Sequence, residues 1–255
     1  MPFEPVQSEK LSSAVVRQIE LLILRGVLRA GERLPSEREL SERMAVSRPS
    51  LREAIAELQE SGLLVSRANS GIFVADALGS AFSPALTRLM GDHEEAVLDY
   101  VSFRRDMEGL AAERACRHGS DTDLEVVAKV FAQMETAHSK RDPGPEAALD
   151  AEFHLAIVEA SHNVVMLHMM RSMYELLREG VIYNRQVMFR QRATRSLLLD
   201  QHRAINDAIQ ARNGVAARKA VEDHLDFVLQ SLTDQARADK NDAIARQRLE
   251  HLTSR

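Results

Sequence analysis

The fold of the first part of the chain is decided by residues 34–64, LPSERELSERMAVSRPSLREAIAELQESGLL. Ser36 and Glu39 have the spacing of a capping box, in which the serine hydroxyl accepts a hydrogen bond from the Glu39 amide. In the same motif the Glu39 side chain reaches back to the start of the helix. A short helix is therefore predicted from Ser36 to about Met44.

A second helix is predicted directly after the first. Ala45-Val46 turns the chain, Ser47 is an N-cap residue, and Pro49 is tolerated in the first turn that follows. Apolar residues then recur at helical spacing until Gly62, which is suited to a left-handed stop. The two helices with their tight turn form a candidate helix-turn-helix.

The flanks of this motif complete a small domain. Residues 12–25 carry apolar side chains at helical spacing, and the segment from Leu28 to Leu34 reads as a turn or short strand. After Gly62, two strand-like runs at residues 63–66 and 72–74 flank a turn over residues 68–71. A winged helix-turn-helix is expected, with this β-hairpin as the wing.

The arginines of the candidate motif stand where DNA contacts are made. A recognition helix presents its first turns to base edges while nearby donors bind phosphates. Arginine suits both partners because its planar fork donates two parallel hydrogen bonds. The alternative is that each arginine only pairs with a neighbouring glutamate on a solvated helix face. The combined pattern favours DNA binding by Arg38, Ser47, Arg48, Ser50 and Arg52.

The remainder of the chain predicts a mainly α protein with a second, all-helical domain. Amphipathic helical stretches follow one another from about residue 94 to residue 238, which indicates a bundle of roughly six helices. The predicted organisation is a DNA-binding domain over residues 1–76, a linker over 77–89, a helical domain over 90–238 and a tail over 239–255.

Composition limits the setting in which this protein works. The single cysteine, Cys116, excludes an intrachain disulfide and a cysteine zinc cluster, which favours a reducing cytoplasm. The net charge of −5 argues against nucleic-acid binding by bulk charge, so DNA contacts must come from locally placed arginines. A soluble, cytoplasmic protein with no membrane segment is expected.

Four residues of the helical domain form a candidate metal site. Asp150 and His154 lie one helical turn apart on the same face, and His202 and His224 lie on two later helices. Side chains from facing helices converge in a bundle core, so these four could hold a divalent metal ion such as Zn, Ni or Mn. The alternative is that each histidine is structural, as expected for His93, His118, His138, His162, His168 and His251.

The run at residues 34–64, followed by SGIFV at 70–74, closely resembles the winged helix-turn-helix of GntR-type regulators. The resemblance implies a homodimer on a palindromic operator in double-stranded DNA. It also implies that Arg38, Arg48 and Arg52 contact DNA, that Ser50 supports them, and that Gly71 lies at the wing tip in the minor groove. The family's wing turn is often richer in glycine than this one.

The helical domain is similar to the FCD ligand-binding domain of the FadR-type GntR subfamily. Metal-binding members carry an Asp-x-x-x-His pair and two further histidines, which match Asp150, His154, His202 and His224. In that subfamily an arginine on the first helix of the domain, here Arg104, binds the effector carboxylate together with the metal. Arg104 could instead pair with Glu108 at i,i+4, and both contacts could hold in different ligand states.

Within the subfamily, pyruvate dehydrogenase complex repressors resemble the chain most, through residues 18–40, 47–55 and 159–173. This implies a repressor whose small-acid effector is pyruvate or a related 2-oxo or 2-hydroxy acid, such as lactate or glycolate. The alternatives are a metal-dependent hydrolytic enzyme and a ligand-free dimerisation module fused to a DNA-binding domain. No general base or nucleophile stands at a recognisable spacing, so an enzyme is not expected.

Overall fold

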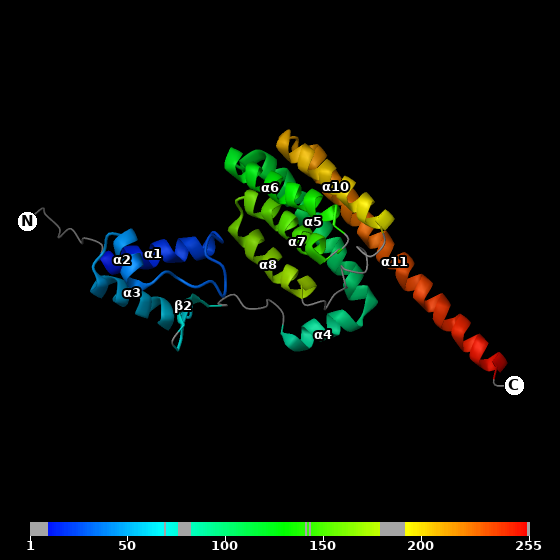
Figure 1. The fold of residues 1–255 in the computed structure, drawn as a ribbon, viewed down its shortest axis with the longest axis horizontal. Coiled ribbons are helices and arrows are strands. Elements are labelled where there is room, and N and C mark those ends of the chain that lie inside the picture. Colours follow the sequence, from blue (N-terminus) through cyan, green and yellow to red (C-terminus); the bar gives the residue numbers. More distant parts are fainter. Residues whose placement is uncertain are drawn as a thin grey trace, which may run out of the picture. The chain divides into compact units, whose positions relative to one another are not determined.

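The computed structural model describes residues 10–68, 70–75, 83–140, 142, 144–178 and 192–253. The chain divides into two compact units, Met1–Gly79 and Ser80–Arg255 (Figure 1). Each unit has its own cluster of buried apolar side chains. The fold class is mainly α, as predicted.

The first unit is a winged helix-turn-helix. Its elements are α1 (Leu11–Leu24), α2 (Glu37–Arg43), α3 (Arg48–Glu60), β1 (Leu64–Arg67) and β2 (Gly71–Val74). The Ser36 hydroxyl accepts from the Glu39 amide at 3.3 Å and the Ser47 hydroxyl from the Ser50 amide at 3.3 Å, so both predicted helix starts are confirmed. The Glu39 carboxylate does not complete the capping box, since it accepts from Nη2 of Arg43 at 2.6 Å.

The core of this unit lies between α1 and α3. Helix α3 buries Leu51, Ala54, Ile55 and Leu58, which recur at the spacing of a single helical face. They pack with Val15, Val16 and Ile19 of α1. Ala45, with φ 51°, makes the tight turn between α2 and α3, and Gly62, with φ 77°, ends α3 as predicted.

The wing is an antiparallel hairpin extended by a third segment. Strands β1 and β2 pair in the register Leu64 with Val74 and Arg67 with Gly71. The segment between α1 and α2 joins the other edge of β2: the Leu34 amide donates to the Ile72 carbonyl and the Val74 amide donates to the Glu32 carbonyl, both at 2.9 Å. The predicted turn or short strand before α2 is thus a turn that ends in an isolated β-bridge, in which Arg33 pairs with Phe73. Asn69 of the predicted wing turn lies outside the described residues.

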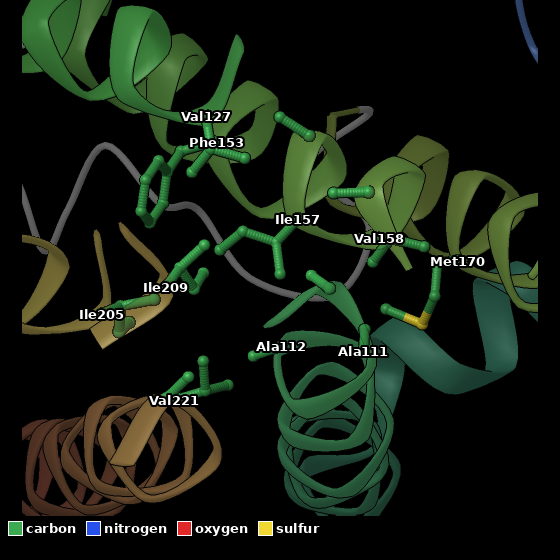
Figure 2. Packing of buried hydrophobic residues seen from close by; sticks show 14 of the residues in the cluster. Ala111, Ala112, Val127, Phe153, Ile157, Val158, Met170, Ile205, Ile209 and Val221 are labelled. Atoms are coloured by element: carbon green, nitrogen blue, oxygen red, sulfur yellow. The ribbon is translucent and has the colours of Figure 1, made fainter. Parts of the chain in front are cut away.

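The second unit is helical throughout its described residues. Its helices are α4 (Pro84–Asp92), α5 (Glu94–His118), α6 (Asp121–His138), α7 (Gly144–Ala160), α8 (Val164–Arg178), α10 (Arg192–Gln210) and α11 (Gly214–Thr253). Helix α5 packs along α11, and α6 packs along α7 (Figure 1). Phe153 and Ile157 of α7 meet Ile205 and Ile209 of α10 in the bundle core (Figure 2).

Two segments differ from the sequence expectation. The predicted linker over 77–89 is helical from Pro84 onward, because the Ser83 hydroxyl accepts from the Leu86 amide at 3.2 Å and proline suits the first turn. The predicted tail over 239–255 continues α11 to Thr253, since no helix breaker interrupts it. Within the described residues, no helix combines the length and apolar character needed to cross a membrane.

Candidate functional site

Three helices bring Asp150, His154, His202 and His224 together inside the bundle. Asp150 and His154 come from α7, His202 from α10 and His224 from α11. One potential ligand atom from each residue lies within 4.8 Å of the others. All four side chains are buried, with none more than 3% exposed as a residue. The four residues singled out from spacing and resemblance therefore form one cluster.

The distances within this cluster suit a shared ion. Oδ1 of Asp150 lies 3.0 Å from Nε2 of His202 and 3.9 Å from Nε2 of His154. The two Nε2 atoms are 3.2 Å apart. Because Zn–N and Zn–O bonds are about 2.0–2.2 Å long, two ligands of one ion lie at most about 4.4 Å apart. Only small side-chain adjustments separate this arrangement from a coordination shell.

Outer partners set which ring nitrogen of two histidines faces the cluster. Nδ1 of His154 lies 2.7 Å from Oε2 of Glu108, and Nδ1 of His224 lies 2.9 Å from Oε1 of Gln201. An oxygen acceptor at Nδ1 favours the proton there, which leaves the Nε2 lone pair for a metal. Nδ1 of His202 is buried without a hydrogen-bond partner among the described residues, and the short contact of His154 Nδ1 with Oε2 of Glu108 lacks the alignment of a hydrogen bond.

Burial favours the neutral form of two of these imidazoles, those of His154 and His224. It lowers the pKa of His154, although the nearby carboxylates of Glu108 and Asp150 act in the opposite direction. Burial, with the neighbouring His202 and His154, also holds the pKa of His224 well below its usual value. Neutral imidazole is the form that ligates metals, so the electrostatics of the cluster agree with its geometry.

Without a metal ion, the buried nitrogen atoms of the cluster cannot all form hydrogen bonds. The facing Nε2 atoms of His154 and His202 can share only one proton between them, and a buried lone pair without a donor costs free energy. A cation would contact both nitrogens and the Asp150 carboxylate at once. Three imidazole nitrogens and one carboxylate oxygen are also donors that divalent transition metals accept. The residues present therefore fit a divalent metal ion.

Arg104 lies beside this cluster on α5 and is only 1% exposed. Its Nε donates to Oε1 of Glu108 at 2.6 Å, so the predicted i,i+4 ion pair is present. Oε1 also accepts from the Tyr174 hydroxyl at 2.7 Å. Burial opposes the charge of Glu108, but Arg104 and His154 outweigh it and hold the pKa of that carboxyl well below its usual range.

The candidate DNA-contacting residues lie on the exposed side of the first unit. Arg38 on α2 and Arg48 at the start of α3 are exposed, and neither has an ion-pair partner among the described residues. Arg52 is different, because its Nε lies 2.8 Å from Oε2 of Glu37 on α2. Ser47 and Ser50 form the cap of α3, with their hydroxyls 2.9 Å apart.

Gly71 is the first residue of strand β2. Its φ of 106° is a backbone conformation that residues with a Cβ rarely adopt. A Cβ built there would also come within 3.1 Å of Nε of Arg33. The backbone conformation therefore favours glycine at this end of the wing, whereas the Arg33 side chain could shift to admit a Cβ.

Sequence reasoning missed three neighbours of the buried cluster. It considered Glu108 only as a partner of Arg104 and gave no role to Gln201 or Tyr174. Glu108 and Tyr174 meet across 66 residues of sequence, so no local spacing reveals the contact. The i,i+4 spacing of Glu108 from Arg104 was the one signal that the sequence offered for this residue.

Two family models match the chain. Residues 11–74 match the bacterial regulatory proteins of the gntR family, and residues 99–227 match the FCD domain. The chain belongs to the GntR family. The resemblance to regulators of the FadR type with an FCD domain is thus confirmed, and the GntR protein is a transcriptional regulator that binds operator DNA. Families and relatives are regulators, so the enzyme alternative is not supported.

Similar proteins cover nearly the whole chain. A protein of Escherichia coli K12 named as an L-lactate dehydrogenase operon regulatory protein is 36% identical over 91% of this chain and 92% of its own length. The Glc operon transcriptional activator of the same organism is 29% identical over 88% of this chain and 89% of its own length. Among solved structures, Streptococcus agalactiae GntR has 27% identity and a TM-score of 0.52, covering 86% of this chain and 99% of the other.

Proposed function

We propose that this GntR protein is a metal-dependent repressor that senses a small 2-hydroxy or 2-oxo acid and binds a palindromic operator as a homodimer. The metal is a divalent ion, Zn, Ni or Mn, and Arg104 binds the carboxylate of the acid. The ligands of the metal are Asp150, His154, His202 and His224.

One observation carries this proposal: a buried cluster that could hold a metal lies next to a buried arginine. His154 and Arg104 both contact the same carboxylate, that of Glu108. A 2-hydroxy or 2-oxo acid carries two adjacent oxygen functions, which suit a cation and a guanidinium placed side by side. A bound divalent ion supplies the positive charge that holds the acid's oxygens, while Arg104 orients its carboxylate.

The names of the relatives support the class of acid. One is named for an L-lactate dehydrogenase operon, which makes L-lactate the first effector to test, followed by pyruvate and glycolate. The other is named as an activator, so relatives of this chain differ in the sign of regulation. For this protein we propose repression that the acid relieves.

The proposed DNA contacts follow from exposure and charge in the first unit. Arg38 and Arg48 are free to bind phosphates or base edges, and Ser50 supports them at the start of α3. Arg52 reaches the DNA from a position fixed by Glu37. Gly71 allows the wing backbone to approach the minor groove closely.

Acid binding alters the operator affinity by moving helices of the second unit. The site takes residues from α5, α7, α10 and α11, so a ligand that draws them together changes the packing of most of the bundle. In the dimer this changes the spacing of the two recognition helices. A differential affinity of about 1–3 kcal/mol between the two states is sufficient, as in other allosteric proteins.

The proposal is tested by metal analysis and thermal denaturation of the purified protein. We expect about one Zn, Ni or Mn per chain and a melting temperature that rises when L-lactate, pyruvate or glycolate is added. His202→Ala removes both the metal and the response, whereas the exposed control His118→Ala retains both. A wild-type protein without bound metal and without a response to any of the acids favours the ligand-free dimerisation module.

A further inference from the structure

The carboxylate of Glu108 lies between the two halves of the proposed site. Its Oε1 atom accepts from Nε of Arg104 at 2.6 Å and from the Tyr174 hydroxyl at 2.7 Å. Its Oε2 atom lies 2.7 Å from Nδ1 of His154. The side chain is 2% exposed, so these three groups, and not water, surround the charge.

The contact with His154 orients a metal ligand. A carboxylate 2.7 Å from Nδ1 favours the proton on that nitrogen through its charge, although the pair lacks the alignment of a hydrogen bond, and Nε2 is left as the acceptor that faces the cluster. Loss of such an outer partner typically costs about 10–100-fold in metal affinity. Of the three clustered histidines, only His154 has a charged residue at Nδ1 among the described residues.

The contact between Glu108 and Arg104 occupies the guanidinium group that the carboxylate of an acid would need. Nε of Arg104 is engaged by Glu108, and Nη2 lies 3.4 Å from the Tyr174 hydroxyl. A buried guanidinium without a counter-charge is costly, so Glu108 stabilises Arg104 when no acid is bound. A carboxylate arriving from outside offers the same chemistry and competes for the same nitrogens.

We propose that Glu108 is a positioning residue that aligns His154 for the metal and holds Arg104 until the carboxylate of the acid takes its place. The inference rests on the proposed function, which supplies the metal and the acid. The exchange alters contacts among α5, α7 and α8 at once, because Glu108, His154 and Tyr174 lie on these three helices. The Glu108 side chain thereby affects both binding events in opposite directions: it strengthens metal binding and weakens acid binding.

The variant Glu108→Gln tests this coupling, since it keeps the shape of the side chain and removes its charge. The matched control is Glu95→Gln, at an exposed position on the same helix. Zn affinity is measured by competition with a chromophoric chelator. The affinities for L-lactate, pyruvate and glycolate are measured by calorimetry at saturating Zn. We expect Zn binding to weaken about 10–100-fold and binding of the preferred acid to tighten about fivefold or more.

If Glu108 has a merely structural role, Glu108→Gln weakens the affinities for Zn and for the acid together, and that result overturns the inference. Affinities of Glu108→Gln equal to those of Glu95→Gln also overturn it. If the wild type binds neither Zn nor any of the acids, the proposed function itself fails, so the two failures are distinguishable. Should Glu108→Gln not fold, Tyr174→Phe keeps both charges and removes one hydrogen bond that holds Glu108. Acid binding should then tighten by up to about fivefold, and weaker acid binding contradicts the inference.

Discussion

Individual arginines of the first unit have different tasks because their neighbours differ. Arg52 is held by Glu37 across the helix-turn-helix, whereas Arg48 is exposed and has no ion-pair partner among the described residues. An arginine tied to a carboxylate must give up part of that contact to bind a phosphate or a base, while a free arginine loses only hydration and conformational entropy. Replacement of Arg48 therefore tests DNA recognition more directly than replacement of Arg52.

We expect Arg48→Ala to weaken binding to the specific operator by about 1–3 kcal/mol, since the variant would lose the proposed contact to a base. Dimerisation should be unchanged, because the residue lies at the start of α3 on the exposed surface. The measurement is fluorescence anisotropy with operator and scrambled DNA, using Arg246→Ala in α11 as the matched loss of one exposed arginine. An operator affinity equal to that of the control means that α3 does not read DNA through this residue.

Helix starts are the elements that the sequence specifies most directly. Helix α6 begins with a complete capping box, in which the Ser120 hydroxyl accepts from the Asp123 amide at 3.1 Å and Asp123 accepts from the Ser120 amide at 2.8 Å. His162, between α7 and α8, adds a further contact to Asp123 at 2.9 Å. One carboxylate thus fixes the start of α6 and attaches it to the turn that follows α7.

Asp123→Ala should reduce the free energy of unfolding by about 1 kcal/mol at pH 7, as expected for a lost helix cap. Burial raises the pKa of Asp123, but hydrogen bonds from Ser120 and His162 lower it more, so the folded-state pKa lies below the unfolded value. The stabilisation is therefore present above the unfolded pKa of about 3.9 and is lost as the pH falls through the folded pKa. The free energy of unfolding is measured with urea at pH 7 and at acid pH, with Asp242→Ala as control. The difference between wild type and Asp123→Ala should be smaller at acid pH than at pH 7. A difference that does not depend on pH argues against the ionised cap.

The elements also show what sequence can and cannot predict. Local signals such as Ser36, Ser47 and Gly62 placed α2 and α3 correctly because capping is decided by a few neighbouring residues. The Ser83 cap is an equally local signal, and it was overlooked because small residues and Pro84 gave the segment the character of a linker. Asp150 and His154 share a helix and were linked by spacing. Their approach to His202 and His224 depends on tertiary packing, which spacing does not contain.

At the scale of the whole molecule, two compact units divide the work. The first carries the surface arginines and the wing, and the second carries the buried cluster with Arg104 and Glu108. The candidate DNA contacts and the candidate ligand site lie in different units, so the proposed response to an acid requires both. The proposed communication between them is therefore measured on operator binding by the full chain.

The central claim is tested most directly by the operator affinity of the full-length, metal-loaded protein with and without L-lactate, pyruvate and glycolate. We predict that at least one acid weakens operator binding about 5–150-fold, the usual range of allosteric coupling. The effect should disappear in His202→Ala and after chelation of the metal, while DNA binding itself stays measurable. An affinity that none of the acids changes, or a response that persists in full in His202→Ala, contradicts the account.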